Sequence, residues 1–469
     1  MLIVKTSKQY ILEKCYIFDI VLGRFLGLDF SVEQDYDINH NTLTDSNTGQ
    51  RLELRNHLFG TPEKEWLTFS ALPKSELRLW KLPDKLLKVN ALAELSIPVI
   101  YGDSPENSQF YTCSDSLVKL GLDVFGSIFF MLTRYEEYVK PDRDQFGRFP
   151  ATASLAYQED FLHRPIVNEY VDILWACVKK LWPGLERQPR KFQMHVSHDV
   201  DSPYQYTFTN FSLLARNLAG DLIKRRNLEQ GLFRMRTWNQ VKQGNLAADP
   251  FNTFNWLMDL SEKHSLISAF YFITDTTDKK RDGNYSIHHP AIRQLIRHIH
   301  RRGHEIGLHP SFNTYLDAAQ TQKEFDILHQ VCMEEGVEQQ SWGGRQHYLR
   351  WSNPHTWQNW EKAGLSYDST LTFPEMPGFR CGTCDEFPAY DVVNRKPLNL
   401  IERPLVVMES TIFDERYLGL GHDLSQAFDR IVDLKQTCRK YRGNFTLLWH
   451  NNHLTTSDER DLYQQVMVY

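Results

Sequence analysis

The sequence predicts an α/β protein with two domains, of which the second is a parallel sheet closed as a barrel with helices outside. Its 469 residues are too many for one ordinary hydrophobic core. Residues 182–190 gather two Pro, one Gly and three charged side chains, the composition of an interdomain linker. Beyond them, strand-like runs alternate with helices, as in a parallel sheet. We therefore expect a smaller mixed α/β domain at 1–188 and a (β/α) barrel at 189–469.

The first domain offers three clear elements and no catalytic constellation. Residues 95–101 predict a short strand, and Pro98 favours a sheet edge because proline cannot donate to a ladder. Residues 124–138 are apolar and then charged, as in a buried helix that emerges into solvent. Residues 165–177 begin with proline and carry apolar side chains at helical spacing, so another helix is expected there.

In the second domain the strand and helix signals follow one another in order. An apolar run at 192–198 predicts a buried strand. Residues 290–302 place four apolar side chains at i, i+3, i+4 and i+7, which is the face of a helix packed on a sheet, and Gly303 ends that helix. We expect further strands at 268–273, 305–308, 340–345, 365–368 and 445–449, and further helices at 252–264, 320–335, 354–363 and around 424–432.

Composition excludes some partners and indicates a compartment. The net charge of -6 argues against nucleic acid, because phosphate binding needs a basic excess. Charged residues interrupt the apolar ones at 1–25, and no run is long enough to span a membrane, so we expect a soluble, cytoplasmic protein. Seven Cys are an odd, sparse count that fits reduced thiols. Cys381 and Cys384 form one C-x-x-C pair, half a zinc site at most, which we interpret as a loop with free thiols.

An insertion at 221–249 separates the first strand of the second domain from its next helix. It carries six Lys and Arg among bulky apolar residues. Peripheral contact with an anionic membrane surface, or with a phosphorylated carrier, is one interpretation. A solvated helical face is the more common structure for such a run, and both stay open.

The chemistry of the second domain lies in the residues that follow its strands. Asp199 and Asp201 follow the first strand, and side chains two apart in an extended chain point the same way, so both carboxylates can approach one metal ion. Alone, such a pair is more often a solvated turn. The carboxyl ends of parallel strands meet at one edge, however, so complementary polar groups at five strand ends indicate an active site. The later predicted strands end in His309, Arg345, Asp368 and His450.

These residues and their spacing resemble the NodB-homology polysaccharide deacetylases, carbohydrate esterase family four, over residues 190–455. The resemblance implies a distorted (β/α) barrel of the polysaccharide deacetylase type, a divalent metal, for which we expect zinc, and hydrolysis of an acyl group. The preceding domain is similar to the amino-terminal module of a bacterial branch of the family. The matching segments are 197–201, 303–313, 343–351, 363–370 and 447–450.

The resemblance implies a metal site built from Asp201 and His309. The family places a second His four residues after the first, but position 313 is Asn. Asn313 is therefore the expected third ligand, and the resulting set is harder and weaker than one with two imidazoles. Ser311, and His304 in a shifted register, are the other candidates.

The same resemblance and the needs of amide hydrolysis predict the catalytic groups. Asp199 accepts the proton of the attacking water, and Arg345 keeps that carboxylate ionised. His450, held by Asp368, donates a proton to the departing amine. The backbone N–H near Tyr348 completes the site for the oxyanion.

We therefore predict a metal-dependent hydrolase that removes an acetyl or other acyl group from an N-acylated sugar, an intermediate of bacterial surface polysaccharide synthesis. Such an enzyme acts on carbon–nitrogen bonds other than peptide bonds. Two alternatives stay open. If position 313 prevents metal loading, the barrel is an inactive glycan-binding or scaffold protein. If the substrate is not a carbohydrate, the protein is a metal-dependent hydrolase of another amide.

Overall fold

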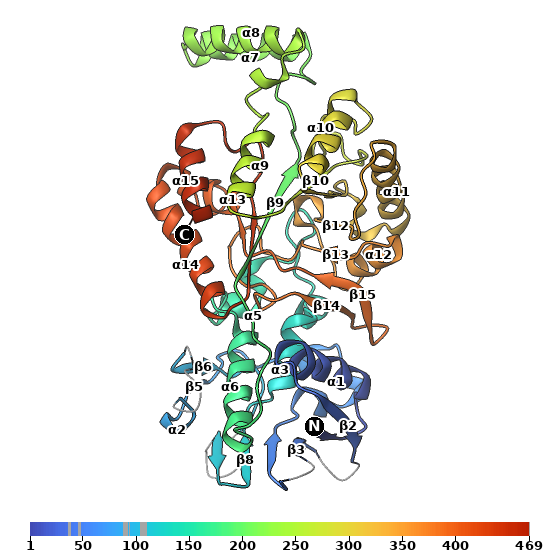
Figure 1. Cartoon of the computed structure of the whole chain (residues 1–469), viewed down its shortest axis with the longest axis vertical. Helices are drawn as coiled ribbons and strands as arrows, with labels where there is room; N and C mark the ends of the chain where they lie inside the picture. The colour runs from blue at the N-terminus through green and yellow to red at the C-terminus, as the bar shows by residue number, and fades with distance from the viewer. Residues whose placement is uncertain (36–38, 46–47, 88–91, 93, 104–109, 469) are drawn as a thin grey trace.

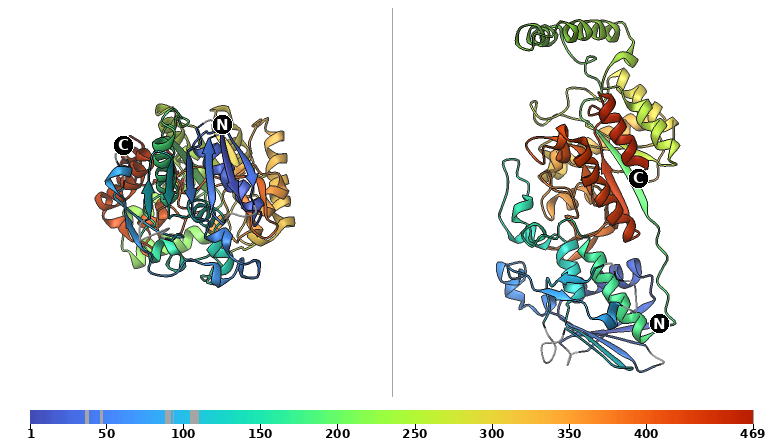
Figure 2. Two further views of the ribbon diagram at one scale, coloured as in Figure 1. Left: turned by 90° about the horizontal axis from the view of Figure 1, so that it is seen from below. Right: turned by 90° about the vertical axis from the view of Figure 1, so that its left-hand side faces the viewer.

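Two sheets are stacked along the long axis of the molecule, and a pair of helices projects at one end (Figure 1). The computed structural model describes residues 1–35, 39–45, 48–87, 92, 94–103 and 110–468. The smaller sheet contains the amino terminus. An extended segment at 183–192 runs from it to the larger sheet, as the right-hand view of Figure 2 shows.

The smaller sheet has six strands in the order β2-β1-β3-β4-β8-β7. The pairs β1–β2 and β4–β8 are parallel and the other pairs are antiparallel. A separate antiparallel pair joins β5 (Leu79–Lys81) to β6 (Ser96–Pro98). The six strands are β1 (Leu2–Thr6), β2 (Phe30–Gln34), β3 (Asn41–Asp45), β4 (Arg51–Leu54), β7 (Tyr111–Cys113) and β8 (Leu117–Leu120).

Helices of this first unit fill the space beside the smaller sheet. α6 packs on β4, β8 and α3, and α1 reaches β15 of the larger sheet. α3 ends at Leu132 because Arg134 adopts a left-handed backbone with φ 51°, and a new helix starts after it. The helices are α1 (Ile11–Phe18), α2 (Asp84–Leu87), α3 (Val124–Leu132), α4 (Tyr135–Val139), α5 (Leu155–Gln158) and α6 (Ile166–Leu181).

The larger sheet has nine strands in the order β14-β15-β13-β12-β11-β10-β9-β17-β16, all parallel except the β14–β15 hairpin. β9 lies inside it, paired with β10 and β17, and residues 196–200 are all buried. Burial of every side chain is typical of a parallel strand covered on both faces. The strands are β9 (Gln193–Val200), β10 (Ser268–Phe272), β11 (Glu305–Leu308), β12 (Gly343–Gly344), β13 (Tyr367–Asp368), β14 (Phe387–Asp391), β15 (Lys396–Glu402), β16 (Val407–Met408) and β17 (Asn444–Leu448).

Helices cover the outside of the larger sheet, with α10, α11 and α12 on one side and α14 and α15 on the other (Figure 1). α10 shows how the sequence sets a boundary: the His289 side chain accepts from the Ala291 N–H, Pro290 begins the helix, and its four buried isoleucine and leucine side chains face the sheet. The helices are α9 (Phe254–Lys263), α10 (Pro290–Arg301), α11 (Ala318–Glu334), α12 (His355–Ala363), α13 (Glu409–Phe413), α14 (Leu424–Lys440) and α15 (Ser457–Val468).

The mixed α/β class is confirmed, but the closed barrel is not. The sheet curls, and no pairing between β14 and β16 closes it among the residues that the structure describes. The β14–β15 hairpin, which the sequence analysis did not expect, occupies one edge and leaves the curl open. The strand expected at 340–345 is reduced to Gly343–Gly344, and that expected at 365–368 to Tyr367–Asp368.

Buried ion pairs join the two units. Glu137 on α4 accepts from Arg380, which follows β13, at 2.6 and 2.9 Å, and from Arg134 at 2.8 Å. All three side chains are buried. Burial opposes the charged carboxylate, but Arg380 and Arg134 outweigh it and lower the pKa of Glu137. Because buried charges need partners, this group fixes the first unit against the second.

Between β9 and α9 the chain forms a projecting arm, residues 211–242. It consists of α7 (Phe211–Ala219), a π-helical turn (Gly220–Lys224) and α8 (Leu228–Lys242). The arm lies beyond the larger sheet at the end toward which β9 points (Figure 1). No helix in the described ranges is long and apolar enough to cross a membrane.

Candidate metal and catalytic site

The site is built around the end of β9. Asp199 is buried inside the sheet, whereas Asp201, just past the strand, is partly open to the cavity. Arg345, which follows β12, donates through Nη1 to Oδ1 of Asp199 at 2.8 Å. Its Nη2 donates to the hydroxyls of Ser197 and Ser369, and its Nε to the Ser369 carbonyl. A fully buried guanidinium with this many acceptors holds the Asp199 carboxylate in one orientation.

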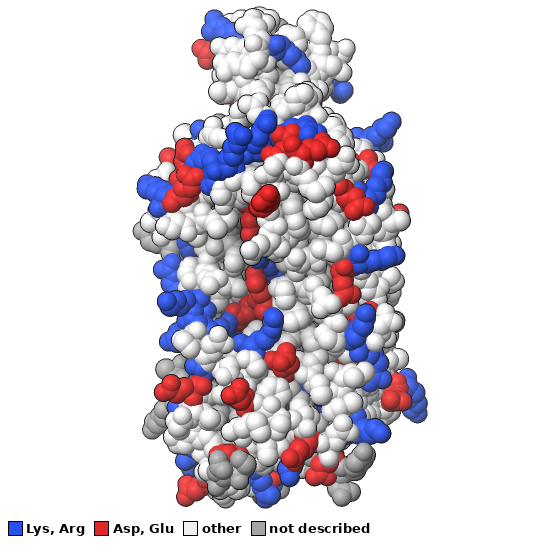
Figure 3. Space-filling model, turned by 45° about the vertical axis from the view of Figure 1, so that its right-hand side comes forward, with Lys and Arg blue, Asp and Glu red and all other residues white. Residues whose placement is uncertain are grey.

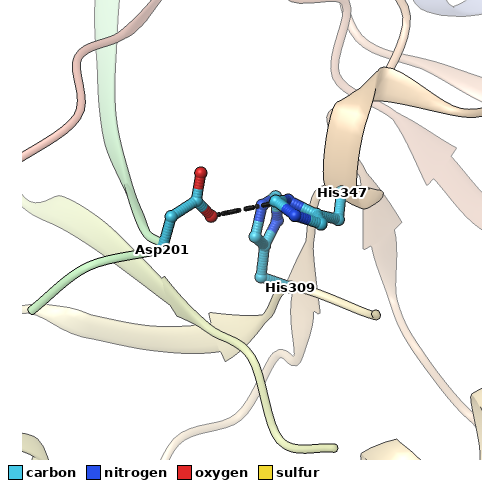
Figure 4. A group of neighbouring side chains, drawn as sticks. All are labelled: Asp201, His309 and His347. Carbon is cyan, nitrogen blue, oxygen red and sulfur yellow. Dashed lines mark hydrogen bonds and ion pairs between the residues drawn. The ribbon is translucent and has the colours of Figure 1, made fainter. Parts of the chain in front are cut away.

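Three ligand-type side chains meet beside Asp199 (Figure 4): Asp201, His309 and His347. Nε2 of His309 lies 3.1 Å from Oδ1 of Asp201, and Nδ1 of His347 lies 3.5 Å from the same oxygen. The two ring nitrogens are 2.9 Å apart. β9, β11 and the loop after β12 supply these residues, because neighbouring parallel strands end at one edge.

Backbone carbonyls fix the tautomer of both imidazoles. Nδ1 of His309 is 2.6 Å from the Arg345 carbonyl, and Nε2 of His347 is 2.9 Å from the Arg281 carbonyl. A carbonyl can only accept, so each of these nitrogens carries a hydrogen, and in the neutral ring the other nitrogen presents a lone pair. Both lone pairs point to the same place as Asp201. Metal-binding histidines are held in this way by an acceptor behind the ring.

The donor set fits a cation. Oδ1 of Asp201 is buried and receives no hydrogen bond from any described residue. Two imidazole lone pairs and a carboxylate oxygen at these distances repel one another unless a positive charge lies between them. Burial opposes ionisation here, but His347, His309 and His450 outweigh it and hold the pKa of Asp201 well below its usual range. Similarly, Asp199 and Asp201 outweigh burial and raise the pKa of His309.

Asn313 is not brought to this group, which corrects the expected ligand set. Its side chain is exposed, donates to the Thr277 carbonyl at 3.3 Å and accepts from Arg350 at 3.1 Å. His347 stands in its place. Sequence reasoning passed over His347 although it lies two residues after Arg345, the same spacing that relates Asp199 to Asp201.

His450, past the end of β17, lies on the other side of Asp201. Its Nε2 is 3.6 Å from Oδ2 of Asp201, and its Nδ1 is 2.6 Å from Oε1 of Glu409 at the start of α13. His453 contacts the same Glu409 oxygen at 2.8 Å. Burial disfavours the imidazolium, but Glu409 and the nearby Asp carboxylates outweigh it and raise the pKa of His450 to about 10. The ring is therefore protonated at neutral pH.

The partner of His450 is thus Glu409 and not Asp368, a second correction. Asp368 is buried and accepts from the N–H of Thr370 at 3.0 Å. Burial raises the pKa of Asp368 to about 7, against the hydrogen bonds from Thr370. Glu409 could have been found by the signal that revealed the other strand ends, because the apolar run 405–408 stops at it.

A cavity of about 180 Å³ opens over these groups, and both units of the chain line it. Phe146 and Arg148 come from the loop between α4 and α5, and Arg416 and Tyr417 come from the segment after α13. Tyr348 also lines it and has a left-handed backbone with φ 60°. A larger hollow of about 590 Å³ lies at the amino-terminal ends of the strands, and the ligand-type group does not border it.

The loop 140–150 is attached to the second unit by arginine side chains that donate to backbone carbonyls. Arg148 donates to the Tyr348 carbonyl at 3.1 Å, and Arg350 donates to the Phe146 carbonyl at 2.6 Å. The rings of Phe146 and Tyr348 are 5.4 Å apart. No catalytic constellation is expected in the first unit from its sequence, and neither Phe146 nor Arg148 has a local sequence pattern that indicates a place in the cavity wall.

Comparison with protein-family models gives a match to the first unit of the chain. Residues 2–183 match the model of a family of unknown function (DUF7033). No curated protein matches the chain. Among solved structures, a protein assigned as a polysaccharide deacetylase from Mycobacterium smegmatis is 16% identical with a TM-score of 0.39, covering 60% of this chain and 84% of that one.

Two further structures match at a similar level. Puue allantoinase is 12% identical with a TM-score of 0.35, covering 61% of this chain and 85% of its own. A protein from Pseudomonas aeruginosa PAO1, also assigned as a polysaccharide deacetylase, is 15% identical with a TM-score of 0.35, covering 61% and 86%. The function proposed below therefore rests on the geometry of the site.

Proposed function

We propose that this protein is a metal-dependent hydrolase that removes an acyl group, such as acetyl, from the nitrogen of an acylated sugar. The observation that carries the proposal is the Asp201–His309–His347 group, flanked by Asp199 on one side and His450 on the other. Amide hydrolysis needs a base, a polarised carbonyl and an acid for the leaving amine, and these five residues supply groups for all three. We take residues 189–469 as the catalytic domain and 1–188 as a separate domain.

Zinc fits the donor set best, because two imidazole nitrogens and one carboxylate oxygen suit it, whereas magnesium and calcium prefer oxygen alone. Asp201, His309 and His347 would hold it. A zinc ion bound there supplies Lewis acidity for the acyl carbonyl and for water.

Asp199 is the base in this proposal. Its Oδ1 is occupied by Arg345, while its Oδ2 is directed to the ligand group, 3.8 Å from Nε2 of His309. Oδ2 is therefore the oxygen that takes the proton of the attacking water. Arg345 keeps the carboxylate ionised and stops it from turning.

His450 is the acid. Its Nδ1–H donates to Glu409, so the imidazolium presents Nε2–H toward Asp201 and the cavity. That proton goes to the departing amine. The Tyr348 N–H is the donor proposed for the oxyanion. In this proposal Asp368 has a structural role, because its side chain accepts a hydrogen bond from the Thr370 N–H.

An N-acylated sugar suits the cavity for two reasons. Phe146, Tyr348 and Tyr417 place aromatic faces at its wall, and aromatic faces pack well on the apolar face of a sugar ring. The sequence motifs also resemble those of enzymes that act on such sugars. All seven cysteines are free thiols, which supports a reducing, cytoplasmic compartment.

The test combines metal analysis with a substrate panel. The purified protein is loaded with zinc, its metal content is measured, and acetate release is followed with acetamido sugars and with simple amides. We expect about one zinc per chain and release from sugars. A protein that stays metal-free would favour a scaffold that binds glycan without hydrolysis, and release from simple amides alone would favour a non-carbohydrate hydrolase.

A further inference from the structure

The arm, residues 211–242, exposes an unusual concentration of large apolar side chains. Eight of the twenty exposed large apolar residues in the described part of the chain lie in it, including Ile223 at 77% and Phe211 at 70% exposure. Exposed apolar residues scattered singly need no explanation, but a cluster marks an interaction surface. The eight are Phe211, Leu213, Leu222, Ile223, Leu228, Leu232, Phe233 and Met235.

Three of these residues share one face of α8 (Leu228–Lys242). Leu228, Leu232 and Met235 recur at i, i+4 and i+7, so they form one face of the helix. The opposite face holds the arm together, because Thr237 and Val241 are buried there. Figure 3 shows the arm as a projecting knob of mainly uncharged atoms with Lys and Arg on it.

The charge of the arm differs in sign from that of the chain. Residues 211–242 contain seven Lys and Arg against two Asp and Glu, a local charge of +5, whereas the whole chain has -6. Asp221 is buried and neutralised by Arg225 and Arg234. Four exposed cations have no ion-pair partner among the described residues: Arg216, Lys224, Arg226 and Arg236.

We propose that the arm is a membrane-docking element that inserts its apolar side chains into an anionic lipid surface. An interfacial helix of this kind combines apolar residues that enter the headgroup region with cations that pair with acidic lipids. A second copy of the arm fits less well, because two surfaces of charge +5 repel each other. This binding is independent of the hydrolase proposed above.

Docking would also place the catalytic site near lipid. The chain enters the arm within ten residues of Asp201, which is a proposed metal ligand, and leaves it into α9 beside β9 and β10. The catalytic unit is therefore tethered by both ends of the arm. A substrate carried at a membrane would be met at this end of the sheet.

The experiment is sedimentation of the full-length protein with vesicles. One set is pure phosphatidylcholine, and the other is equal parts of phosphatidylcholine and phosphatidylglycerol. We expect the bound fraction to be at least tenfold higher on the anionic vesicles and to fall as salt rises. Equal binding to both sets, or none to either, would overturn the proposal.

Matched variants separate the arm from the rest of the surface. Ile223→Asp with Leu232→Asp, and separately Lys224→Glu with Arg226→Glu, should each lower the partition coefficient by roughly tenfold or more. The matched controls are Ile267→Asp with Leu79→Asp and Lys180→Glu with Lys362→Glu, which alter other exposed positions outside the arm. Controls that lose binding as much as the arm variants would contradict an arm-specific site.

Two further measurements, of hydrolysis and of molecular mass, test whether the arm variants affect membrane binding alone. Hydrolysis of a soluble acetamido sugar should be unchanged in the arm variants, because none of the four residues lines the catalytic cavity. Sedimentation equilibrium should show the same mass for wild type and variants. Self-association that disappears with Ile223→Asp and Leu232→Asp, in a protein that does not bind vesicles, would assign the arm to a second copy instead.

Discussion

Asp199 and Asp201 are separated by one residue, but different groups surround their carboxylates. Asp199 is buried and fastened to a guanidinium, whereas Asp201 faces two imidazole lone pairs and receives no hydrogen bond on Oδ1. A carboxylate tied to Arg345 suits proton transfer, because its charge and orientation are fixed. A carboxylate oxygen without a donor, beside two imidazoles whose far nitrogens are held by carbonyls, suits a cation.

Replacing each aspartate should therefore separate chemistry from metal binding. Asp199→Asn should lower kcat about a thousandfold, the size expected when a general base is removed, and keep its zinc. Asp201→Ala and His347→Ala should lose both zinc and turnover. Zinc content by mass spectrometry and acetate release measure the two effects, with Asp259→Asn on the exposed face of α9 as control. Full activity in Asp199→Asn would remove that residue as base.

Glu409 should act on the reaction through His450 and not by touching the substrate. Glu409→Gln removes the charge that favours the imidazolium, so the pKa of His450 falls and less of it is protonated at alkaline pH. We expect the alkaline limb of the kcat profile to move to lower pH, with zinc content unchanged. Glu409→Asp should restore part of the shift. A uniform loss of kcat at all pH values would instead indicate a structural role.

Glu324 on α11 makes stability depend on pH. Burial raises its pKa to about 7, although Ser311 and Gln320 hydrogen bonds oppose this. Between the unfolded pKa near 4.5 and about 7, the native state alone binds the proton, so stability falls as pH rises through this window, by at most about 1.4 kcal/mol per unit. Glu324→Gln resembles the protonated form.

Urea unfolding at pH 5 and pH 8 tests this effect. The variant should gain about 2 kcal/mol relative to wild type on going from the lower to the higher pH. Glu229→Gln, an exposed residue of the arm, should show no such difference. A stability difference that is the same at both pH values would mean that Glu324 titrates alike in the folded and unfolded chain.

At the scale of elements, the loop 140–150 contributes Phe146 and Arg148 to the wall of the cavity. Phe146 is partly exposed at the wall and its ring lies 5.4 Å from that of Tyr348. Phe146→Ala should raise KM for the best acetamido sugar by about three- to tenfold, the worth of one aromatic contact, while kcat changes little. Phe69→Ala, on the exposed surface of the same unit, is the control. An unchanged KM would remove Phe146 from substrate recognition.

The strands and loops also show which residues of the site can be predicted from the sequence and which cannot. Asp201, His309 and His450 follow strands with apolar runs, and Asp199 lies near the end of the first of them, so their convergence at one edge could be predicted from the alternation. Arg345 follows Gly343–Gly344, a two-residue strand without an apolar run. Glu409 follows the apolar run 405–408 and could have been found in the same way, although β16 itself is only two residues long. The spacing of a motif pointed to Asn313, but the turn after β11 directs that side chain to Arg350. A contact across 200 residues, such as that of Arg148 with Tyr348, leaves no local pattern.

At the scale of the whole molecule, Glu137 holds the two units together. It is the only carboxylate in the buried contact with both Arg134 and Arg380 among the hydrogen bonds of the described residues. Glu137→Gln leaves a buried guanidinium partly unpaired, which costs about 3 to 5 kcal/mol. Unfolding in urea measures the loss, and Glu33→Gln at an exposed pair with Lys5 should cost less than about 1 kcal/mol.

The contacts between the two units also predict how a truncated protein behaves. A chain that begins at residue 189 exposes the surface of β15 that α1 covers and the Tyr390 ring that Phe129 of α3 contacts, and it leaves Arg380 without Glu137. We expect such a fragment to be insoluble, although it contains every proposed metal ligand. The soluble yield of the fragment against the full chain measures this. A soluble, zinc-binding fragment would show that the first unit is not required for folding.

Phe146, Arg148 and Tyr348 form one wall of the cavity, and this shared wall links the evolution of the two units. Two segments far apart in the chain form one surface, so a change in the loop 140–150 that alters the wall selects for a compensating change near Tyr348. The curled sheet joined to a different amino-terminal unit would keep Asp201, His309 and His347 and lose Phe146 and Arg148 from its cavity wall. If the cavity binds the proposed substrate, substrate preference would be inherited by the pair of units together.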